Sequence, residues 1–237
     1  MEALDNLQLG RIVTDHPSTA RVLEKYGLDY CCNGKRSLAD ACRQKGIAAA
    51  DVSEELQEAI ELPGGEQVDF DTWSAEKLIT YVLLKHHFYV KQEIPSISFH
   101  LSKVADKHGD KFPYMLEVQQ LWRQLAEELL SHLKKEEDIL FPAIIALEKG
   151  VGVDQGRAGL RDVRNPMVQL EHEHDQAGVL MARIRELTNQ YTPHPLACTT
   201  HRLTLQELAA FELDLHQHIH LENNIIFPKA LELNKIK

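Results

Sequence analysis

Apolar residues recur at helical spacing along most of the chain, and no stretch of useful length alternates with the period of two that marks a strand. Four long segments carry the helical pattern, and the breaks between them contain glycine or proline. Helices joined by short connections pack antiparallel, so the pattern predicts an all-α protein built on an antiparallel four-helix bundle. The predicted helices cover roughly 74–105, 114–148, 163–190 and 200–233.

The chain before these segments has a pattern of shorter helices. Apolar stretches with helical spacing occur at 9–13, 19–26 and 51–60. Ser37 and Asp40 resemble a capping box, with Asp where Glu is usual, and predict a further helix that ends at about Gly46. Leu62-Pro63-Gly64-Gly65-Glu66 is the clearest linker signal in the chain. We therefore expect a small helical domain at 1–61, a linker at 62–73 and the bundle at 74–237.

Two of the long helices repeat one phrase, His-x-x-x-Glu-x-x-Ile-(Leu/Ile)-Phe-Pro, 86 residues apart. The phrase places His132 and Glu136 in the second helix and His218 and Glu222 in the fourth. Apolar residues stand at the same offsets from both histidines, so each helix turns one imidazole and one carboxylate towards the core. A buried carboxylate is costly unless a charge compensates it. Two such positions facing one core favour a bound cation over a hydrogen-bonded network.

The other two helices offer further histidines as ligands. In the third helix, His174 shares a stripe with apolar residues, which favours it over His172. In the first, His86 and His87 each share a stripe with apolar residues, and periodicity does not separate them. The resulting set, four histidines and two glutamates, suits non-haem iron, manganese or zinc. A dinuclear iron site bridged by the glutamates fits better than structural zinc, which needs only four ligands.

Two more histidines flank His218 on another face of the fourth helix. His216 and His220 stand four residues apart, and alone they are a candidate zinc pair. The second helix has Leu130 and Lys134 at the matching positions. We therefore expect these two histidines on the solvent side or behind the ligands.

Charge and length exclude several classes of function. The formal net charge is −10 and no long run of Lys or Arg occurs, which disfavours nucleic acid as a partner. The apolar run Ile139–Leu147, interrupted by Pro142, is too short to span a bilayer. The N-terminus lacks the basic and then apolar order of a secretory signal, so we expect a cytoplasmic protein without a membrane partner. The 13 histidines direct attention to metal instead.

Together these motifs resemble the hemerythrin-like family and, more closely, the repair-of-iron-centres proteins, a di-iron family that repairs iron–sulfur clusters. The resemblance covers almost the full length. It rests on LDYCCNGKRSL at 28–38, on both His-x-x-x-Glu phrases, on His87 eight residues before Pro95, on EHD at 173–175 and on ACTT at 197–200. The double-cysteine motif combined with the bundle motifs is highly specific.

The resemblance implies a centre of two non-haem irons with an oxo or water bridge. It selects His87 over His86 by the distance to Pro95. It also implies that the protein restores iron–sulfur clusters damaged by nitric oxide or peroxide, with damaged iron–sulfur proteins as partners. The implied ligands are His87 and His132 for one iron, His174 and His218 for the other, and Glu136 and Glu222 as bridges.

Cys31 and Cys32 are adjacent in a turn of the small domain, and we expect them to be thiols at rest and to sit apart from the bundle. By residue type alone, plain burial is the better interpretation. The resemblance adds a redox or iron relay as their role. Lys35 and Arg36 follow closely and are expected to lower the pKa of the thiols.

Two backbone features need an explanation. Asn33 stands where the resembling family more often has glycine, and we expect it to adopt left-handed backbone angles there. Pro95, Pro142 and Pro228 lie inside predicted helices, eight to ten residues past a ligand. Proline removes a backbone donor, so each helix is expected to kink or end near it.

Repair of clusters by iron donation or redox relay is the function that the sequence favours. One alternative is a protein that binds or senses dioxygen or nitric oxide, and another is an oxidoreductase acting on nitrogen oxides. The adjacent cysteines favour repair, because reversible gas binding needs no thiols. The chain has no flavin or nucleotide signature, so an oxidoreductase would need an outside electron donor. The sequence leaves open the client enzymes, the choice between iron and electrons, and the oligomeric state, a homodimer included.

Overall fold

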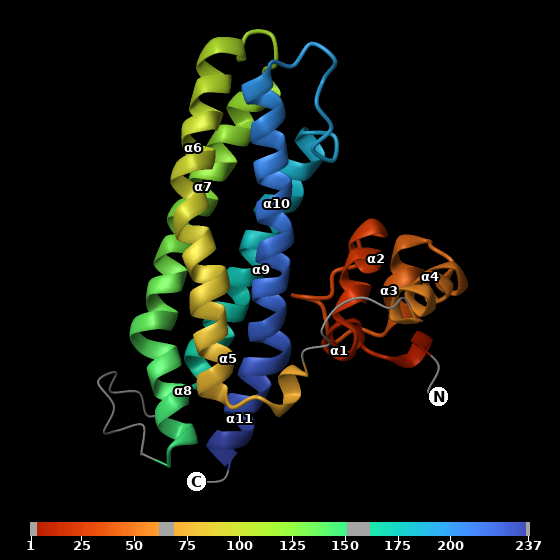
Figure 1. Ribbon diagram of the computed structural model, residues 1–237, viewed down its shortest axis with the longest axis vertical. Helices are drawn as coiled ribbons and strands as arrows, with labels where there is room; N and C mark the ends of the chain where they lie inside the picture. The colour runs from red at the N-terminus through yellow and green to blue at the C-terminus, as the bar shows by residue number, and fades with distance from the viewer. Residues whose placement is uncertain (1–3, 62–68, 151–161, 236–237) are drawn as a thin grey trace.

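Four long helical arms lie side by side in the computed structural model, and a small domain packs against one side of them, next to α10 (Figure 1). The structure describes residues 4–61, 69–150 and 162–235. Within these ranges it consists of helices, turns and connecting segments, with an isolated β-bridge between Gln8 and Ser37. The prediction of an all-α fold is therefore confirmed. No helix in the described ranges combines the length and hydropathy needed to cross a membrane.

Three of the four arms consist of two α-helices joined by a π-helical turn. The predicted ends of the arms are correct to within three residues. The arms are α5 (Ala75–Val82) with α6 (Phe88–His108), α7 (Tyr114–Lys135) with α8 (Phe141–Glu148), α9 (Arg164–Leu187), and α10 (Thr199–Leu221) with α11 (Phe227–Lys235). The three π-turns are Leu83–His87, Glu136–Leu140 and Glu222–Ile226.

Two apolar clusters fill the bundle, one on each side of a buried polar layer. One cluster includes Leu101, Trp122 and Phe211 and is continuous with the core of the small domain. The other includes Phe141 and Phe227. Both clusters keep water away from the layer between them, which makes an unpaired charge there costly. The layer consists of His87, His132, Glu136, His174, His218 and Glu222, with His86 beside it.

The small domain forms from the short helices that the sequence predicts. Its helices are α1 (Leu9–Asp15), α2 (Ala20–Lys25), α3 (Leu38–Lys45) and α4 (Ala49–Glu61). The Ser37 hydroxyl accepts a hydrogen bond from the backbone N–H of Asp40, and Gly46 ends α3 at a φ of 68°. Both caps are as predicted. The linker signal at 62–66 lies outside the described residues.

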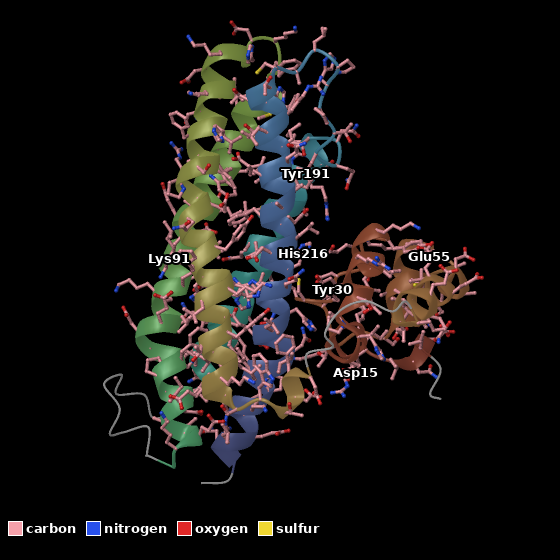
Figure 2. The ribbon with its side chains drawn as sticks, in the orientation of Figure 1. Asp15, Tyr30, Glu55, Lys91, Tyr191 and His216 are labelled. Atoms are coloured by element: carbon pink, nitrogen blue, oxygen red, sulfur yellow. The ribbon has the colours of Figure 1, made fainter. Side chains whose placement is uncertain are left out.

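The turn that carries the cysteines packs directly against the bundle, so the expectation that it sits apart is wrong. The side-chain amide of Asn224, in the last π-turn, donates to the carbonyl oxygens of Tyr30 (3.2 Å) and Cys31 (3.1 Å). The ring of Tyr30 lies edge-on to His216, with centroids 6.3 Å apart, and Figure 2 shows both at the junction of the small domain and α10. The small domain is therefore fixed to the bundle beside the buried polar layer.

Candidate metal centre

The six ligands predicted from the sequence converge in one buried layer. Glu136 and Glu222 are fully buried, and each histidine is at most 2% exposed. The candidate ligand atoms form two groups, and in each group they lie within 4.8 Å of one another. Both groups share Glu136 and Glu222, so both carboxylates are placed to bridge two cations. The groups are His87 and His218 with the two glutamates, and His132 and His174 with the same two.

This grouping differs from the pairing that the resemblance implied. The structure puts His87 with His218, and His132 with His174. The Nε2 atoms of His132 and His174 lie 2.9 Å apart. The first arm therefore shares a cation position with the fourth, and the second arm with the third.

Unpartnered buried atoms show that the layer suits a cation. Both carboxylate oxygens of Glu136, Oε2 of Glu222 and Nε2 of His87 are buried and have no hydrogen-bond partner. The His87 Nε2 lies 3.5 Å from Glu136 Oε2 and 3.6 Å from Glu222 Oε1, distances that suit ion pairing more than a hydrogen bond. Leaving such groups unpaired in an apolar interior costs several kcal/mol each. Cations held by imidazole and carboxylate ligands would remove that cost.

The π-turns explain the Phe-Pro endings of the repeated phrase. The N–H of Phe141 donates to the carbonyl of Glu136, and that of Phe227 to Glu222, which are bonds to the fifth preceding residue. Pro142 then follows in the first turn of α8, where a missing N–H is tolerated. Pi-turns insert one residue into a helix and are frequent at functional sites.

The sequence predicted that each helix would kink or end near its proline, and the second of these two outcomes is wrong. The helix that contains Pro95 continues to His108, and the helices after the other two π-turns continue well past Pro142 and Pro228. At the π-turns, the helical backbone continues without a break towards Pro142 and Pro228. A 3.6-residue pattern in the sequence does not predict such turns.

Without metal, the carboxylates are compensated by two protonated histidines. Burial alone would lower the pKa of His87, but the negative charges of Glu136 and Glu222 outweigh it and raise the pKa to about 10. Burial likewise opposes protonation of His132, and the charge of Glu136 raises its pKa to about 9. Burial lowers the pKa of His218, so that imidazole is neutral at pH 7. A metal that binds here must displace protons, so its affinity rises with pH.

The metal-free protein is expected to lose stability as the pH rises from 7 to 10. The folded-state pKa values of His87 and His132, about 10 and about 9, exceed the usual value of 6.5. Their contribution to stability is therefore complete below pH 6.5 and lost as the pH passes through 9 and 10. Urea unfolding of chelator-treated protein measures the change. The Glu136→Leu variant, which lacks a main partner of both imidazoles, should show a smaller decrease, and an equal decrease in both proteins would contradict the assignment.

Three of the four candidate ligand histidines are oriented by an acceptor behind them. The Nδ1 of His87 donates to Glu137 Oε1 (2.8 Å). The Nδ1 of His132 donates to Glu173 Oε2 at 3.0 Å, and that of His174 to Asn223 Oδ1 at 2.8 Å. Such contacts fix the tautomer, so that Nε2 faces the metal position.

The fourth ligand, His218, is oriented by packing against a histidine. His86 lies parallel to it, with ring centroids 5.7 Å apart, and donates from Nδ1 to Asp214 Oδ1 at 3.0 Å. These positions favour His87 over His86 as the candidate ligand, a choice that periodicity left open. Both His86 and His87 are buried, but His87 faces the glutamates whereas His86 supports His218.

Replacing Glu137 by alanine is expected to weaken Fe(II) binding by roughly 10- to 100-fold, because the acceptor that orients His87 is lost. Titration of the metal-free protein against a competing chelator measures the affinity. Asp138→Ala is the matched control, since Asp138 is the next residue but is exposed and pairs with Lys134. Equal affinities of the two variants would show that Glu137 does not orient the ligand.

Sequence reasoning misplaced His220. It is buried, where a solvent-side position or one behind the ligands was expected, and it lies at the contact between domains. Its Nδ1 accepts from the Asn224 amide (3.2 Å), and its Nε2 is 3.4 Å from the Thr14 hydroxyl. His216 is half-buried near Glu24, at 3.7 Å. Neither histidine belongs to the candidate ligand groups.

Asn223 and Asn224 contact both the candidate metal layer and the cysteine turn, and the sequence reasoning gave them no role. Asn223 supports His174, and its amide nitrogen lies 3.4 Å from the Cys31 carbonyl oxygen. A signal was present, because the two copies of the phrase differ there. The first copy has Glu137-Asp138 where the second has Asn223-Asn224, so the second copy has amides that can contact a carbonyl.

The pKa of Cys31 is raised, where the sequence predicted that basic neighbours would lower it. Cys31 Sγ is buried, 3.7 Å from Cys32 Sγ and 3.3 Å from Asp29 Oδ1. Contact with Cys32, burial and the charge of Asp29 raise the pKa of this thiol well above its usual value. The basic side chains contact other groups: Lys35 pairs with Glu171, and Arg36 bonds to Gln44.

Asn33 supports the turn in a different way from the one predicted. Among the described non-glycine residues, positive φ angles occur at Asn189, Gln190 and Tyr191, not at Asn33. The Asn33 amide instead donates to Asp29 Oδ2 at 2.6 Å. Asparagine therefore contributes a hydrogen bond here and no left-handed conformation.

Two cavities adjoin these groups. One, of about 380 Å³, lies between α7 and α9 and reaches His132 and His174. Its lining includes Glu127, Glu128 and Glu173, so its walls are acidic. The other, of about 470 Å³, lies between the small domain and the bundle and is lined by Cys31 and Cys32 among others.

Comparison with known proteins finds two family models that match separate parts of the chain. Residues 5–60 match a family described as a domain of unknown function (DUF542), and residues 78–230 match the hemerythrin HHE cation binding domain. The iron-sulfur cluster repair protein ScdA of Staphylococcus haemolyticus is 35% identical over 223 residues, covering 93% of this chain and 96% of the relative. The iron-sulfur cluster repair protein YtfE of Citrobacter koseri is 33% identical over 223 residues, covering 94% and 96%. The chain therefore belongs to the hemerythrin HHE family and, within it, to the group of the iron-sulfur cluster repair proteins ScdA and YtfE.

Proposed function

We propose that this protein repairs damaged iron–sulfur clusters by donating iron from a centre of two non-haem irons. The observation that carries the proposal is the pair of buried ligand groups that share both glutamates. Relatives covering nearly the whole chain are named iron-sulfur cluster repair proteins, which supports the same function. The clients are damaged iron–sulfur proteins, and the protein acts in the cytoplasm.

In this proposal each of the six residues has one task. His87 and His218 hold one iron, and His132 and His174 hold the other. Glu136 and Glu222, which belong to both ligand groups, would bind both irons. Bound there, the irons supply exchangeable coordination positions and a releasable metal ion. Imidazole and carboxylate ligands are borderline to hard, so they bind iron without the strength of an all-thiolate site.

The remaining groups prepare the site for loading and release. His87 and His132 accept protons when iron leaves, because Glu136 and Glu222 raise their pKa values. The carboxylates then keep a compensating charge, which limits the cost of the metal-free state. Iron reaches or leaves the His132 side through the acidic cavity between α7 and α9. Cys31 and Cys32 act as the relay towards the client.

A reactivation assay with labelled iron tests the proposal. An iron–sulfur enzyme inactivated by nitric oxide is incubated with this protein loaded with ⁵⁷Fe, under reducing and anaerobic conditions. We expect enzyme activity to return and ⁵⁷Fe to appear in the rebuilt cluster, with no recovery from the iron-poor Glu222→Leu variant. If enzyme activity returns but no ⁵⁷Fe appears in the cluster, the protein repairs the cluster by a redox reaction and not by iron donation. No recovery from the loaded wild-type protein would reject repair.

The cavity that reaches His132 and His174 also favours a second function, the binding of nitric oxide or dioxygen. A small gas can enter a space of about 380 Å³ that ends at two ligands. Nitric oxide titration of the reduced protein separates the possibilities. A reversible spectrum with no reactivation of clients would favour binding or sensing, whereas turnover of nitric oxide with an added electron donor would favour an oxidoreductase.

A further inference from the structure

The double-cysteine turn has the geometry of an open metal site. Two sulfur ligands at about 2.3 Å from a tetrahedral metal stand about 3.8 Å apart. The Sγ atoms of Cys31 and Cys32 are 3.7 Å apart, and Asp29 Oδ1 is 3.3 Å from Cys31 Sγ. All three candidate ligand atoms lie within 4.8 Å of one another. The two thiols are thus already at the spacing at which one cation can bind both.

We propose that Asp29, Cys31 and Cys32 form a second metal site, which takes one thiophilic divalent cation and receives Fe(II) as cargo on its way to a client. The identity of the cargo rests on the proposed function, whereas the site itself does not. This assigns the cysteines to coordination, where the sequence left redox chemistry and iron relay equally open.

Hydrogen bonds within the turn fix the positions of Asp29, Cys31 and Cys32. Asp29 Oδ1 accepts hydrogen bonds from the backbone N–H groups of Cys31 (3.1 Å) and Cys32 (2.9 Å), and Oδ2 accepts from the Asn33 amide. These bonds place both cysteines next to one carboxylate. A site organised in advance loses little conformational entropy when a ligand binds.

Hydrogen bonds from the bundle also fix the position of this turn. The Asn224 amide donates to the carbonyls of Tyr30 and Cys31. Asn223 contacts the Cys31 carbonyl and also accepts from Nδ1 of His174, a ligand of the main centre. A single side chain therefore separates the backbone of the second site from a candidate ligand of the first.

The surroundings of the thiols favour a cation over nucleophilic chemistry. Cys31 Sγ is buried and lies 3.3 Å from Asp29 Oδ1, and this carboxylate repels a thiolate anion. A divalent cation reverses this, because it removes the proton from a coordinating thiol and is attracted by the same carboxylate. The protons of both thiols pass to solvent, and no electrons are exchanged.

The site is open on one side. The turn lines the cavity of about 470 Å³ between the small domain and the bundle. Three protein ligands leave a tetrahedral cation with one free position, which is typical of sites that exchange ligands and not of structural ones. The lining carries Glu24, Asp175 and Glu212 besides Asp29, against Lys45 and Arg185, so its charge suits a cation.

Cobalt(II) titration of the full-length, reduced protein tests the site. Cobalt bound to thiolate gives an intense charge-transfer absorption, and the main centre contains no sulfur ligand. We expect this absorption to saturate at one equivalent of cobalt in the Glu136→Leu/Glu222→Leu double variant, which lacks the main centre.

Cys31→Ser and Cys32→Ser should each abolish this absorption, and Asp29→Asn should weaken cobalt binding by about 10-fold. Cys42→Ser and Cys198→Ser are matched controls that should keep it. Absence of the band, or its persistence in Cys31→Ser, would overturn the proposal.

The labelled-iron assay then tests the cargo separately. Cys31→Ser should retain its full iron in the bundle but transfer ⁵⁷Fe to the client at least 10-fold more slowly. Unchanged transfer would overturn the cargo role and leave repair intact. If wild-type protein binds cobalt as expected but reactivates no client, repair fails and the metal site stands. The two proposals therefore fail in distinguishable ways.

Discussion

Glu136→Leu and Glu222→Leu are each expected to remove most of the iron from the purified protein. Each carboxylate belongs to both ligand groups, so one substitution takes a ligand from both metal positions. A histidine change takes a ligand from one position only. The wild-type protein should contain about two irons per chain, as the two ligand groups imply. Metal analysis after purification, together with the absorption bands of the iron centre, measures the loss.

The fold is expected to survive these changes. In the metal-free protein the glutamates are fully buried, and Glu136 has no hydrogen-bond partner for either oxygen. Without Glu136, the buried imidazoles of His87 and His132 can lose their protons and stay neutral, so no unpaired charge remains in the interior. Circular dichroism melts of the metal-free variants check this. Glu186→Leu, on an exposed position of α9, should keep its iron. Full iron content in Glu136→Leu would contradict bridging by this residue.

Helix positions were predictable from the sequence because burial of one face imposes a 3.6-residue period on each arm. The repeated phrase added the inward direction of His132 and His218, since the apolar residues around each fix the rotation of its helix. Caps were predictable because Ser37 and Gly46 act through local backbone geometry. All of these features depend on residues close together in the chain.

Features that depend on two arms were not predictable in this way. Periodicity says which side of a helix faces the core but not which neighbouring helix it meets, so the grouping of His87 with His218 needed the structure. The π-turn Leu83–His87 adds a residue to one turn, and both His86 and His87 are buried as a result. A regular 3.6-residue pattern of apolar positions does not predict that extra residue.

The contact between domains was the least predictable feature. Asn224 and Cys31 are 193 residues apart, and a polar asparagine on a helix is most often a solvated residue. Its role depends on the close approach of a glycine in the small domain. A Cβ atom at Gly34 would lie 2.5 Å from Asn224 Oδ1. The glycine is therefore needed for space, whereas the turn residues Gly27 and Gly46 have the positive φ angles that favour glycine.

Gly34→Ala is expected to displace the cysteine turn from the bundle and to destabilise the protein by roughly 1–3 kcal/mol. Besides Asn224, the added methyl group would meet the backbone carbonyl oxygen of Tyr30 at 2.4 Å, and a backbone atom cannot rotate away as a side-chain end can. Either shift breaks the hydrogen bonds between Asn224 and the carbonyls of Tyr30 and Cys31. The Cys31 thiol, buried in the wild-type protein, should then react faster with a thiol reagent.

Gly178→Ala provides the matched control for this prediction. Gly178 lies on α9 across the same junction, and a Cβ atom there would meet Cys32 Sγ at 3.8 Å, an ordinary contact. Alanine also favours a helix interior over glycine by up to about 1 kcal/mol, so this variant should be at least as stable as the wild type. Thermal unfolding and the rate of thiol modification are measured on both variants. Equal thiol reactivity in Gly34→Ala and the wild type would mean that the turn keeps its position without the close approach of Gly34 to Asn224. The hydrogen bonds from Asn224 would then not fix the cysteines beside the candidate metal centre.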